Sequence, residues 1–229
     1  MFGINIDPGR MDRAGKPEAV MAEGKSLEEV VASSEEILKT CGKVLITRLP
    51  ENYDLDKFFS DYIILKNRKA RICAIFDKKN YEKWKKCKEG EVVILSAGTS
   101  DLAVAEEAAF TLDFLGINVK RFYDVGVAGL HRLKDPVDYI KSSKAVAVIV
   151  VAGMEGALPS VVAGLVDKPV IAVPTSTGYG VAFNGLTALF SMLLSCPSGV
   201  AVVNIDNGFG AAVFAYTIWR SVKNLMLRL

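Results

Sequence analysis

The chain has 229 residues, of which 51% are hydrophobic, so it is long enough to bury a substantial core in one or two domains. Its 28 basic and 26 acidic residues leave a net charge of only +2, which gives no electrostatic reason to expect nucleic acid as a partner. No apolar run reaches the roughly 18 residues that a membrane-spanning helix needs, so a membrane partner is not expected either.

Four cysteines and a single histidine limit the chemistry further. No two cysteines form a CxxC pair, and His131 alone cannot build a zinc site that needs several histidines. Residues 1–10 contain no apolar segment of the kind that opens a secretory signal peptide. Free thiols in a chain without such a leader predict a cytoplasmic protein.

The first ninety residues predict a small α/β domain. Ser26-Leu27-Glu28-Glu29 has the form of a capping box, in which the serine caps a helix and the last glutamate reaches back. Apolar residues at helical spacing follow until Cys41-Gly42, where the helix should end. Short strands are expected at residues 44–47 and 71–76. The composition changes at residues 89–91, so we divide the chain into domains 1–90 and 91–229.

The second domain alternates strand-like and helical patterns. Strands are expected at residues 92–96, 119–123, 145–152, 170–173 and 200–205, and helices at 102–115, 136–142, 158–166, 186–194 and 209–227. This alternation implies right-handed crossovers and a parallel sheet covered on both faces. Ligands of such folds bind at the carboxyl ends of the strands, so the loops that follow the strands are the candidate site.

Three of these loops carry groups suited to an anionic substrate, because hydroxyls, glycine amides and a helix start can all hold phosphate. A plain helix cap or a flexible lid are the alternative interpretations. The candidate binding residues in these loops are Gly98, Thr99, Ser100, Asp101, Thr175, Ser176, Thr177, Gly178, Asn204, Asp206, Asn207 and Gly208.

Two further loops carry titratable groups. His131 and Arg132 lie in a glycine-rich loop after the second strand of this domain, where a histidine suits proton transfer. Glu155 follows the third strand beside Gly153 and Met154, and a carboxylate among such small and apolar residues suits a general base. Arg132, Gly153 and Met154 are further candidate binding residues. A structural histidine and a solvent-facing loop carboxylate are the plainer alternatives.

Cys196 lies in a turn of serine, proline and glycine before the last strand. Most free cysteines are inert core residues, but a thiol in such a turn can be presented to a ligand. We group this turn with the other five loops at one edge of the sheet, and expect all six to form one active site.

These loops together resemble the PurE family of aminoimidazole ribonucleotide carboxylases and mutases, whose whole domain residues 91–229 cover. Ala97-Gly98-Thr99-Ser100-Asp101 is similar to the family's Gly-Ser-x-Ser-Asp loop, and Leu130-His131-Arg132 to its Ala-His-Arg segment. Residues 169–174 resemble its Pro-Val-Ile-Gly-Val-Pro strand. Residues 155–159 lack the family's second histidine, however, and PurE has neither the cysteine nor the first ninety residues. The resemblance implies a PurE-like, flavodoxin-like three-layer fold with a parallel sheet and a smaller N-terminal α/β domain.

Both differences fit LarB, a PurE-related family of the nickel-pincer cofactor pathway of lactate racemase. Residues 7–25 look like the amino-terminal motif of that family, and residues 151–159 and 195–210 resemble its most specific stretches. The resemblance implies that the chain carboxylates nicotinic acid adenine dinucleotide with CO2 and water. The implied products are pyridinium-3,5-biscarboxylic acid mononucleotide and AMP.

The implied reaction needs a nucleophile, because pyridinium C5 is too electron-poor to attack CO2. A thiolate that adds at C6 makes C5 nucleophilic, and after CO2 is captured a base removes the C5 proton and the thiolate leaves. We expect Cys196 to be the nucleophile and Glu155 the base, with His131 as the alternative base. CO2 or bicarbonate is the co-substrate, and no organic cofactor is expected. Mg²⁺ would neutralise phosphate charge if a metal takes part, although the sequence shows no dedicated metal cage.

The resemblance also implies a homo-oligomer, an octamer as in PurE-like domains. Two other functions remain open on the residues alone. One is a true PurE enzyme acting on an imidazole ribonucleotide, and the other is a non-catalytic nucleotide-binding module such as a sensor.

Overall fold

The structure, a computed structural model, describes residues 7 and 9–228 and divides into two compact units, residues 1–88 and 89–229. The boundary expected from the sequence lay two residues further on. Residues 1–6 and 8 lie outside the described residues, and most of the segment that predicted a leaderless start lies with them. No helix in the described part of the chain has the length and apolar character needed to cross a membrane.

The first unit is a four-stranded mixed sheet with helices. Its elements are α1 (Arg10–Ala14), β1 (Ala19–Met21), α2 (Leu27–Cys41), β2 (Lys43–Thr47), β3 (Ile63–Asn67), β4 (Ile72–Phe76) and α3 (Lys78–Lys86). The strand order is β1-β2-β4-β3, and only the β1–β2 pair is parallel. The expected capping box is confirmed, since Ser26 accepts from the Glu29 amide and donates its own amide to the Glu29 carboxylate. The helix ends at Cys41, and Gly42 takes the left-handed conformation that closes it.

The second unit is an α/β domain around a five-stranded sheet. Its elements are β5 (Glu91–Ser96), η1 (Thr99–Asp101), α4 (Leu102–Phe114), β6 (Asn118–Phe122), η2 (Val127–Leu133), α5 (Lys134–Ser142), β7 (Ala147–Ala152), α6 (Leu158–Ala163), β8 (Val170–Pro174), η3 (Gly180–Gly185), α7 (Leu186–Leu193), β9 (Val200–Val202) and α8 (Gly208–Met226). All neighbouring strands are parallel, in the order β6-β5-β7-β8-β9. The parallel sheet expected from the alternating pattern is confirmed.

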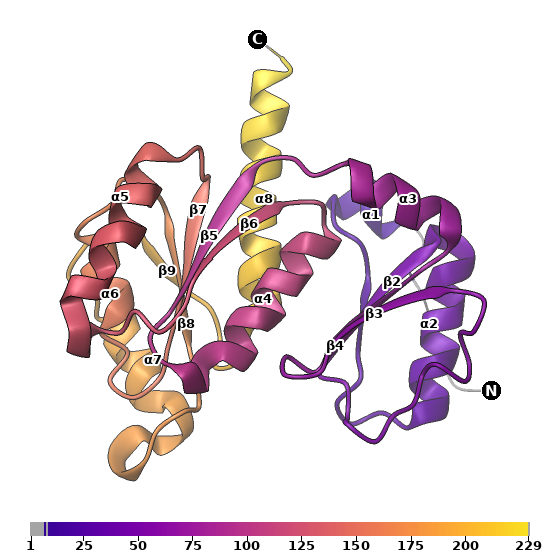
Figure 1. The fold of residues 1–229 in the computed structure, drawn as a ribbon, viewed down its shortest axis with the longest axis horizontal. Coiled ribbons are helices and arrows are strands. Elements are labelled where there is room, and N and C mark those ends of the chain that lie inside the picture. Colours follow the sequence, from indigo (N-terminus) through magenta and orange to yellow (C-terminus); the bar gives the residue numbers. More distant parts are fainter. Residues whose placement is uncertain (1–6, 8, 229) are drawn as a thin grey trace. The chain divides into compact units, whose positions relative to one another are not determined.

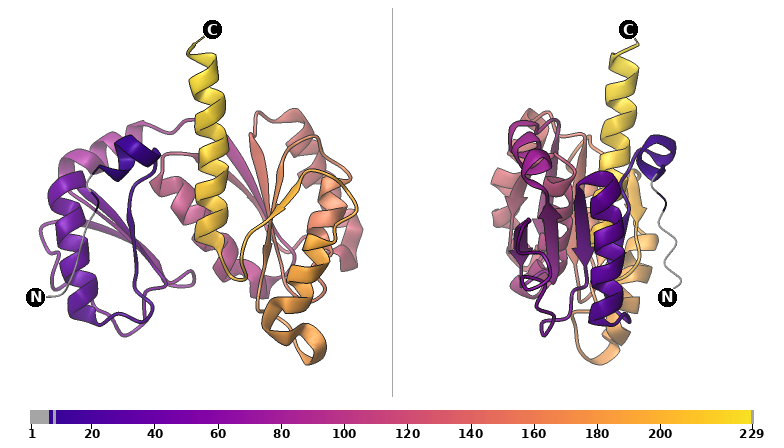
Figure 2. Two further views of the ribbon diagram at one scale, coloured as in Figure 1. Left: turned by 180° about the vertical axis from the view of Figure 1, so that it is seen from behind. Right: turned by 90° about the vertical axis from the view of Figure 1, so that its right-hand side faces the viewer.

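This sheet has helices on both faces (Figures 1 and 2). Helices α4 and α8 pack on one face, and α5, α6 and α7 pack on the other. The central strand β7 is buried along its whole length, which explains its unbroken apolar sequence. The three-layer arrangement fixes all loops after β5, β6, β7 and β8 at one edge of the sheet.

Helices α4 and α8 approach each other closely at Gly208, which the sequence had suggested as a binding residue. A Cβ atom at this position would lie only 2.3 Å from the Val104 carbonyl oxygen, so the glycine is needed for packing. Gly208→Ala should therefore lower the free energy of unfolding by about 1–3 kcal/mol, measured by chemical denaturation. Gly98→Ala is the matched control, since its Cβ would meet nothing closer than 3.6 Å. Equal stability of the two variants would contradict this packing role.

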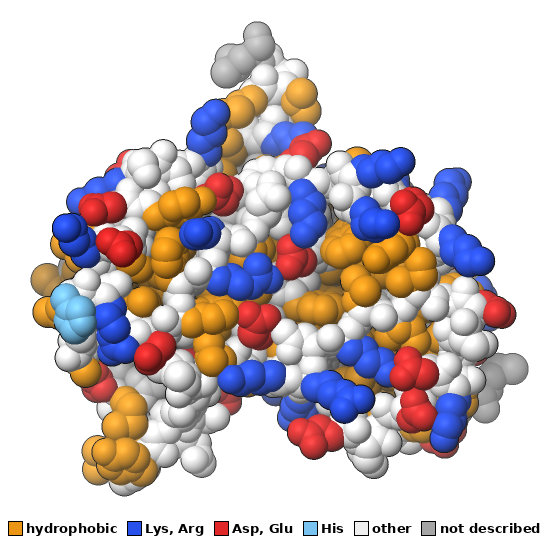
Figure 3. All heavy atoms as spheres, in the orientation of Figure 1, with side chains coloured by type: hydrophobic (Ala, Val, Ile, Leu, Met, Phe, Trp, Pro, Cys, Tyr) orange, Lys and Arg blue, Asp and Glu red, His pale blue; other side chains and the backbone are white. Residues whose placement is uncertain are grey.

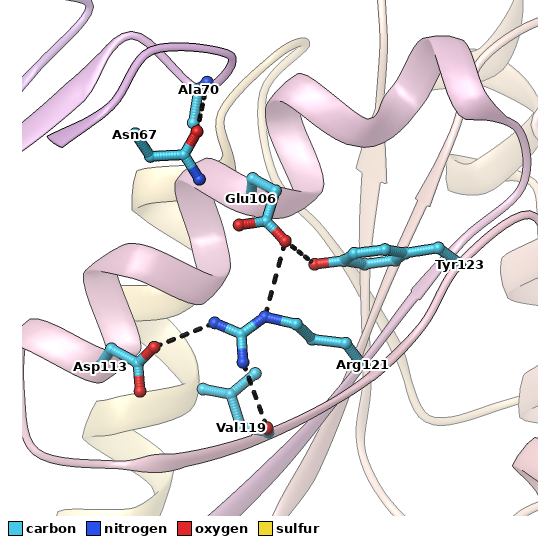
Figure 4. Close-up of polar contacts among 7 residues, drawn as sticks. All are labelled: Asn67, Ala70, Glu106, Asp113, Val119, Arg121 and Tyr123. Carbon is cyan, nitrogen blue, oxygen red and sulfur yellow. Dashed lines mark hydrogen bonds and ion pairs between the residues drawn. The ribbon is translucent and has the colours of Figure 1, made fainter.

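Strand β6 is tied to α4 by a polar cluster around Arg121 (Figure 4). The Arg121 guanidinium contacts the carboxylates of Asp113 at 2.9 Å and Glu106 at 3.6 Å. Tyr123 donates its hydroxyl to Glu106, and burial together with this hydrogen bond raises the pKa of Tyr123. The cluster anchors the end of β6, directly before the loop that carries Asp124 and Arg132.

Candidate active site

A cavity of about 500 Å³ opens at the carboxyl edge of the five-stranded sheet. Its walls come from the segments that follow β5, β6, β7 and β8, as the fold predicts for an open parallel sheet. The lining residues are Ala97, Gly98, Ser100, Asp101, Gly126, Val127, Ala128, Arg132, Ala152, Gly153, Met154, Glu155, Ala157, Leu158, Thr177, Gly178 and Tyr179. The structure thus brings together candidate residues from four of the six loops.

The loops after β7 and β8 are held together by their backbones. The Met154 amide donates to the Thr177 carbonyl oxygen at 2.9 Å. Gly153 makes this contact possible, because a Cβ there would lie 2.5 Å from the same carbonyl. Met154 itself adopts a left-handed conformation with φ 52°, which costs energy for a non-glycine residue. The backbone itself therefore shapes the cavity wall at this edge of the sheet.

Asp101 is a carboxylate buried in the cavity wall, with only 4% of its surface exposed. It accepts hydrogen bonds from the Thr175 hydroxyl at 2.7 Å and from the Gly98 amide at 2.9 Å. Burial raises the pKa of Asp101, although the hydrogen bonds from Thr175, Gly98 and Gly153 lower it in part. The Asp101 side chain is therefore engaged within the wall and does not cap α4, which the sequence had allowed.

The substitution Thr175→Val should destabilise the fold by an amount that depends on whether Asp101 is ionised. Because burial raises the folded pKa of this carboxyl, its ionised form weakens folding above its ordinary pKa, and the Thr175 hydroxyl offsets part of this cost. Removing the hydroxyl should lower the free energy of unfolding by about 1.5–3 kcal/mol at neutral pH. The loss should shrink as the pH falls through the pKa of Asp101, where the carboxyl takes up a proton. Denaturation curves at several pH values test this, and a pH-independent loss would contradict it.

Arg132 lines the cavity from the η2 segment. Its guanidinium pairs with Asp124 at 3.0 Å, and both side chains are partly exposed. Asp124 has a φ of 57°, so the turn after β6 holds the carboxylate in place at some backbone cost. An exposed ion pair of this kind contributes only about 0–1 kcal/mol, so an anionic ligand group can compete for the guanidinium.

The two candidate bases differ in position. Glu155 is exposed in the turn after β7 and belongs to the cavity lining. His131 is exposed and does not belong to the lining, although Val127, Ala128 and Arg132 from the same segment do. Figure 3 shows the single histidine on the outer surface. The geometry therefore favours Glu155 over His131 as the group that meets a bound ligand.

Several candidate binding residues make structural contacts beside the cavity. Asp206 accepts from the Ser176 amide at 2.9 Å, and Asn207 caps α8 by accepting from the Gly210 amide at 2.7 Å. The Thr175 hydroxyl is used by Asp101 and is not available to a phosphate. The predicted residues outside the lining are Thr99, Thr175, Ser176, Asn204, Asp206, Asn207 and Gly208, besides His131 and Cys196.

The prediction that the Cys196 turn lies at the same edge as the other loops is wrong. This turn precedes β9, and Gly199 accepts from the amide of Val170 at the start of β8, so the turn enters the sheet at its amino edge. The five residues of β8, roughly 16 Å of strand, separate Gly199 from the carboxyl edge. Cys196 is exposed with a free thiol, and Ser195 beside it contacts Ser160 of α6 at 2.7 Å.

Within residues 7 and 9–228, no group of three or more His, Cys, Asp or Glu side chains is arranged to hold a metal ion.

Tyr179 lines the mouth of the cavity and was not predicted from the sequence. An aromatic residue between Gly178 and Gly180 in a loop after a strand was the signal that could have found it.

Two protein families match the chain, one in each of its two structural units. Residues 91–228 match the AIR carboxylase family, and residues 3–77 match the LarB/PurE-like N-terminal domain. An uncharacterized protein of Methanocaldococcus jannaschii is 45% identical over 93% of this chain and 82% of its own length.

Relatives with named activities match a little over half of the chain. The N5-carboxyaminoimidazole ribonucleotide mutase of M. jannaschii is 40% identical over 56% of this chain and 77% of its own length, and that of Thermotoga maritima is 35% identical over 56% and 73%. A crystal structure of Treponema denticola PurE aligns with a TM-score of 0.46 and 27% identity, over 61% of this chain and 91% of that one.

Proposed function

Because the chain belongs to the AIR carboxylase family and carries a LarB/PurE-like N-terminal domain, we propose that it carboxylates the pyridinium ring of nicotinic acid adenine dinucleotide. The reaction adds CO2 at C5 and splits the phosphoanhydride with water. It yields pyridinium-3,5-biscarboxylic acid mononucleotide and AMP. The sequence of the 151–159 and 195–210 stretches supports this substrate over an imidazole ribonucleotide.

The observation that carries the proposal is the single cavity that joins Glu155, Arg132 and the 97–101 loop. The Arg132 guanidinium, whose exposed ion pair with Asp124 a ligand can displace, suits the anionic groups of a dinucleotide. Glu155 at the same cavity suits proton removal from a bound ring. Together they offer the binding and proton-transfer groups that the reaction needs.

The chemistry follows from the electron demand of the ring. Addition of a thiolate forms an S–C6 bond and moves one electron pair onto the ring nitrogen, which gives a neutral dihydropyridine. C5 then attacks CO2 and forms a C–C bond. Glu155 takes the C5 proton, the S–C6 bond breaks with its electrons returning to sulfur, and the aromatic cation is restored. The net change at the ring is one CO2 gained and one proton lost.

The thiol in this scheme comes from a neighbouring copy of the chain. Cys196 is exposed and lies outside the cavity of its own chain, so it can serve a cavity only by reaching across to another copy. An apolar face formed by Leu186, Phe190 and Leu193 of α7, with Leu194 directly after the helix, leads up to the cysteine turn and is exposed to solvent. Apolar side chains of this size on one helix suit a contact between copies, which the expected homo-oligomer would bury.

The sequence similarity to N5-carboxyaminoimidazole ribonucleotide mutases favours one competing activity, the carboxylation or rearrangement of an imidazole ribonucleotide. Incubation of the purified protein with CO2 and each substrate, followed by mass spectrometry, separates the two. We expect biscarboxylated mononucleotide and AMP from the dinucleotide, and no product from the imidazole ribonucleotide. Turnover of the imidazole ribonucleotide alone would replace this proposal with the mutase activity, and product from neither would leave a binding module.

A further inference from the structure

Tyr179 stands at the mouth of the cavity and is the most exposed of its large side chains. It belongs to the lining, yet 81% of its surface is open to solvent. Met154 also belongs to the lining, and its sulfur is 3.7 Å from the place of a Cβ on Gly178, the residue before Tyr179 in the chain. The lining thus includes an aromatic ring and a polarizable thioether from two neighbouring segments.

The exposed charges of the lining favour a cation at this entrance. Glu155 is an exposed carboxylate of the lining, whereas Arg132 is the single cationic side chain of the lining among the described residues. Arg132 already pairs with Asp124 at 3.0 Å. The exposed Glu155 carboxylate therefore leaves this part of the cavity attractive to positive charge, and an aromatic face adds to that attraction.

The proposed route of the nucleophile places the reacting ring at the same entrance. A thiol that arrives from another copy reaches the substrate from outside the cavity, so C6 of the ring must lie on the exposed side of the lining, where Tyr179 and Glu155 lie. We propose that the face of Tyr179 stacks on the pyridinium cation. This inference rests on the proposed function and assigns Tyr179 as the residue that selects a charged, flat ring.

The change of charge during the reaction decides which kinetic constant Tyr179 controls. The ring is cationic when it binds and becomes neutral once sulfur has added at C6. Stacking with Tyr179 therefore favours the bound substrate more than the adduct, and its loss weakens binding without slowing the addition. We expect Tyr179→Leu to raise KM by about 3- to 30-fold with kcat unchanged or slightly higher.

The test compares ring charge at constant shape in the full-length protein. In a Cys196→Ala background, which prevents adduct formation, calorimetry gives the affinity for nicotinic acid adenine dinucleotide and for its reduced form with a neutral dihydropyridine ring. Tyr179→Leu should weaken binding of the cationic form by about 3- to 30-fold and of the reduced form by less than about 2-fold. Tyr179→Phe should retain the preference for the cation. Phe183→Leu, an exposed aromatic in the neighbouring segment that does not line the cavity, should change neither affinity.

The outcomes separate this inference from the proposed function. Equal loss for both ring forms, or no loss for either, overturns the assignment of Tyr179, even if the unmodified protein forms the biscarboxylated product. Selective loss for the cation supports the assignment, even if mass spectrometry shows no such product and the proposed reaction fails. Absence of any binding by the unmodified chain overturns both.

Discussion

Replacing Cys196 with alanine is expected to abolish carboxylation, with turnover lower by at least about 10³-fold, because no other group can both add to the ring and leave it. Non-covalent binding of the dinucleotide should change little, since the substitution removes only the sulfur and leaves the lining of the cavity in each chain unchanged. Quantitative mass spectrometry of the product measures the loss. Cys87→Ala is the matched control, because Cys87 is also a free, exposed cysteine but lies in the first unit. Normal product formation by Cys196→Ala would remove the covalent mechanism.

Mixed assemblies show whether the cysteine acts on a neighbouring copy. Cys196→Ala keeps its own cavity intact, and Glu155→Gln keeps its own thiol. When the two inactive chains are unfolded and reassembled together, about a quarter of the sites should combine an intact cavity with an intact thiol if each site is shared between two copies. Activity should therefore reappear in the mixture. A mixture as inactive as its parts would mean that the thiol and the carboxylate must belong to one chain.

Glu155→Gln should lower turnover by about 10²–10⁴-fold, the usual contribution of a positioned general base. The variant should still bind the dinucleotide, because glutamine keeps the shape of the side chain. It should also accumulate the thiol adduct, since sulfur addition precedes proton removal. Intact-protein mass spectrometry after rapid quenching detects the adduct, and product analysis measures turnover.

The competing base is tested by the companion variant His131→Asn. His131 is exposed and lies outside the cavity lining, so this change should leave turnover within about 3-fold of normal, the range of a surface substitution. Near-normal turnover by Glu155→Gln together with a large loss in His131→Asn would reverse the assignment. The histidine would then keep the proton-transfer role that its segment has in the PurE resemblance.

The elements with strong local signals could be predicted from the sequence. The capping box at Ser26 and the left-handed Gly42 fixed both ends of α2, and unbroken apolar runs marked the buried strands of the second unit. The three-residue β1 and the partly exposed β3 were missed because neither carries a clear alternation. Helix α3 buries no residue, so its sequence lacks the apolar stripe on which helix prediction depends.

The site was predicted in part, for a topological reason. Loops that follow parallel strands share one edge, which correctly grouped the 97–101 loop, Arg132 and Glu155. The Cys196 turn precedes its strand and so lies at the other edge, a distinction that residue types alone do not reveal. The direction in which each side chain points could not be predicted from the sequence either. Thr175 was expected to face a phosphate but donates to a buried carboxylate.

Under the proposed mechanism, the separation of the Cys196 turn from the edge that carries Glu155 should make an isolated copy chemically silent. Dinucleotide bound to a newly made chain would meet no thiolate, so premature adducts should not form before copies meet. Assembly would then be the step that starts the chemistry. Specific activity should accordingly fall as the protein is diluted into the range where copies separate, while the affinity of each chain for the dinucleotide stays constant.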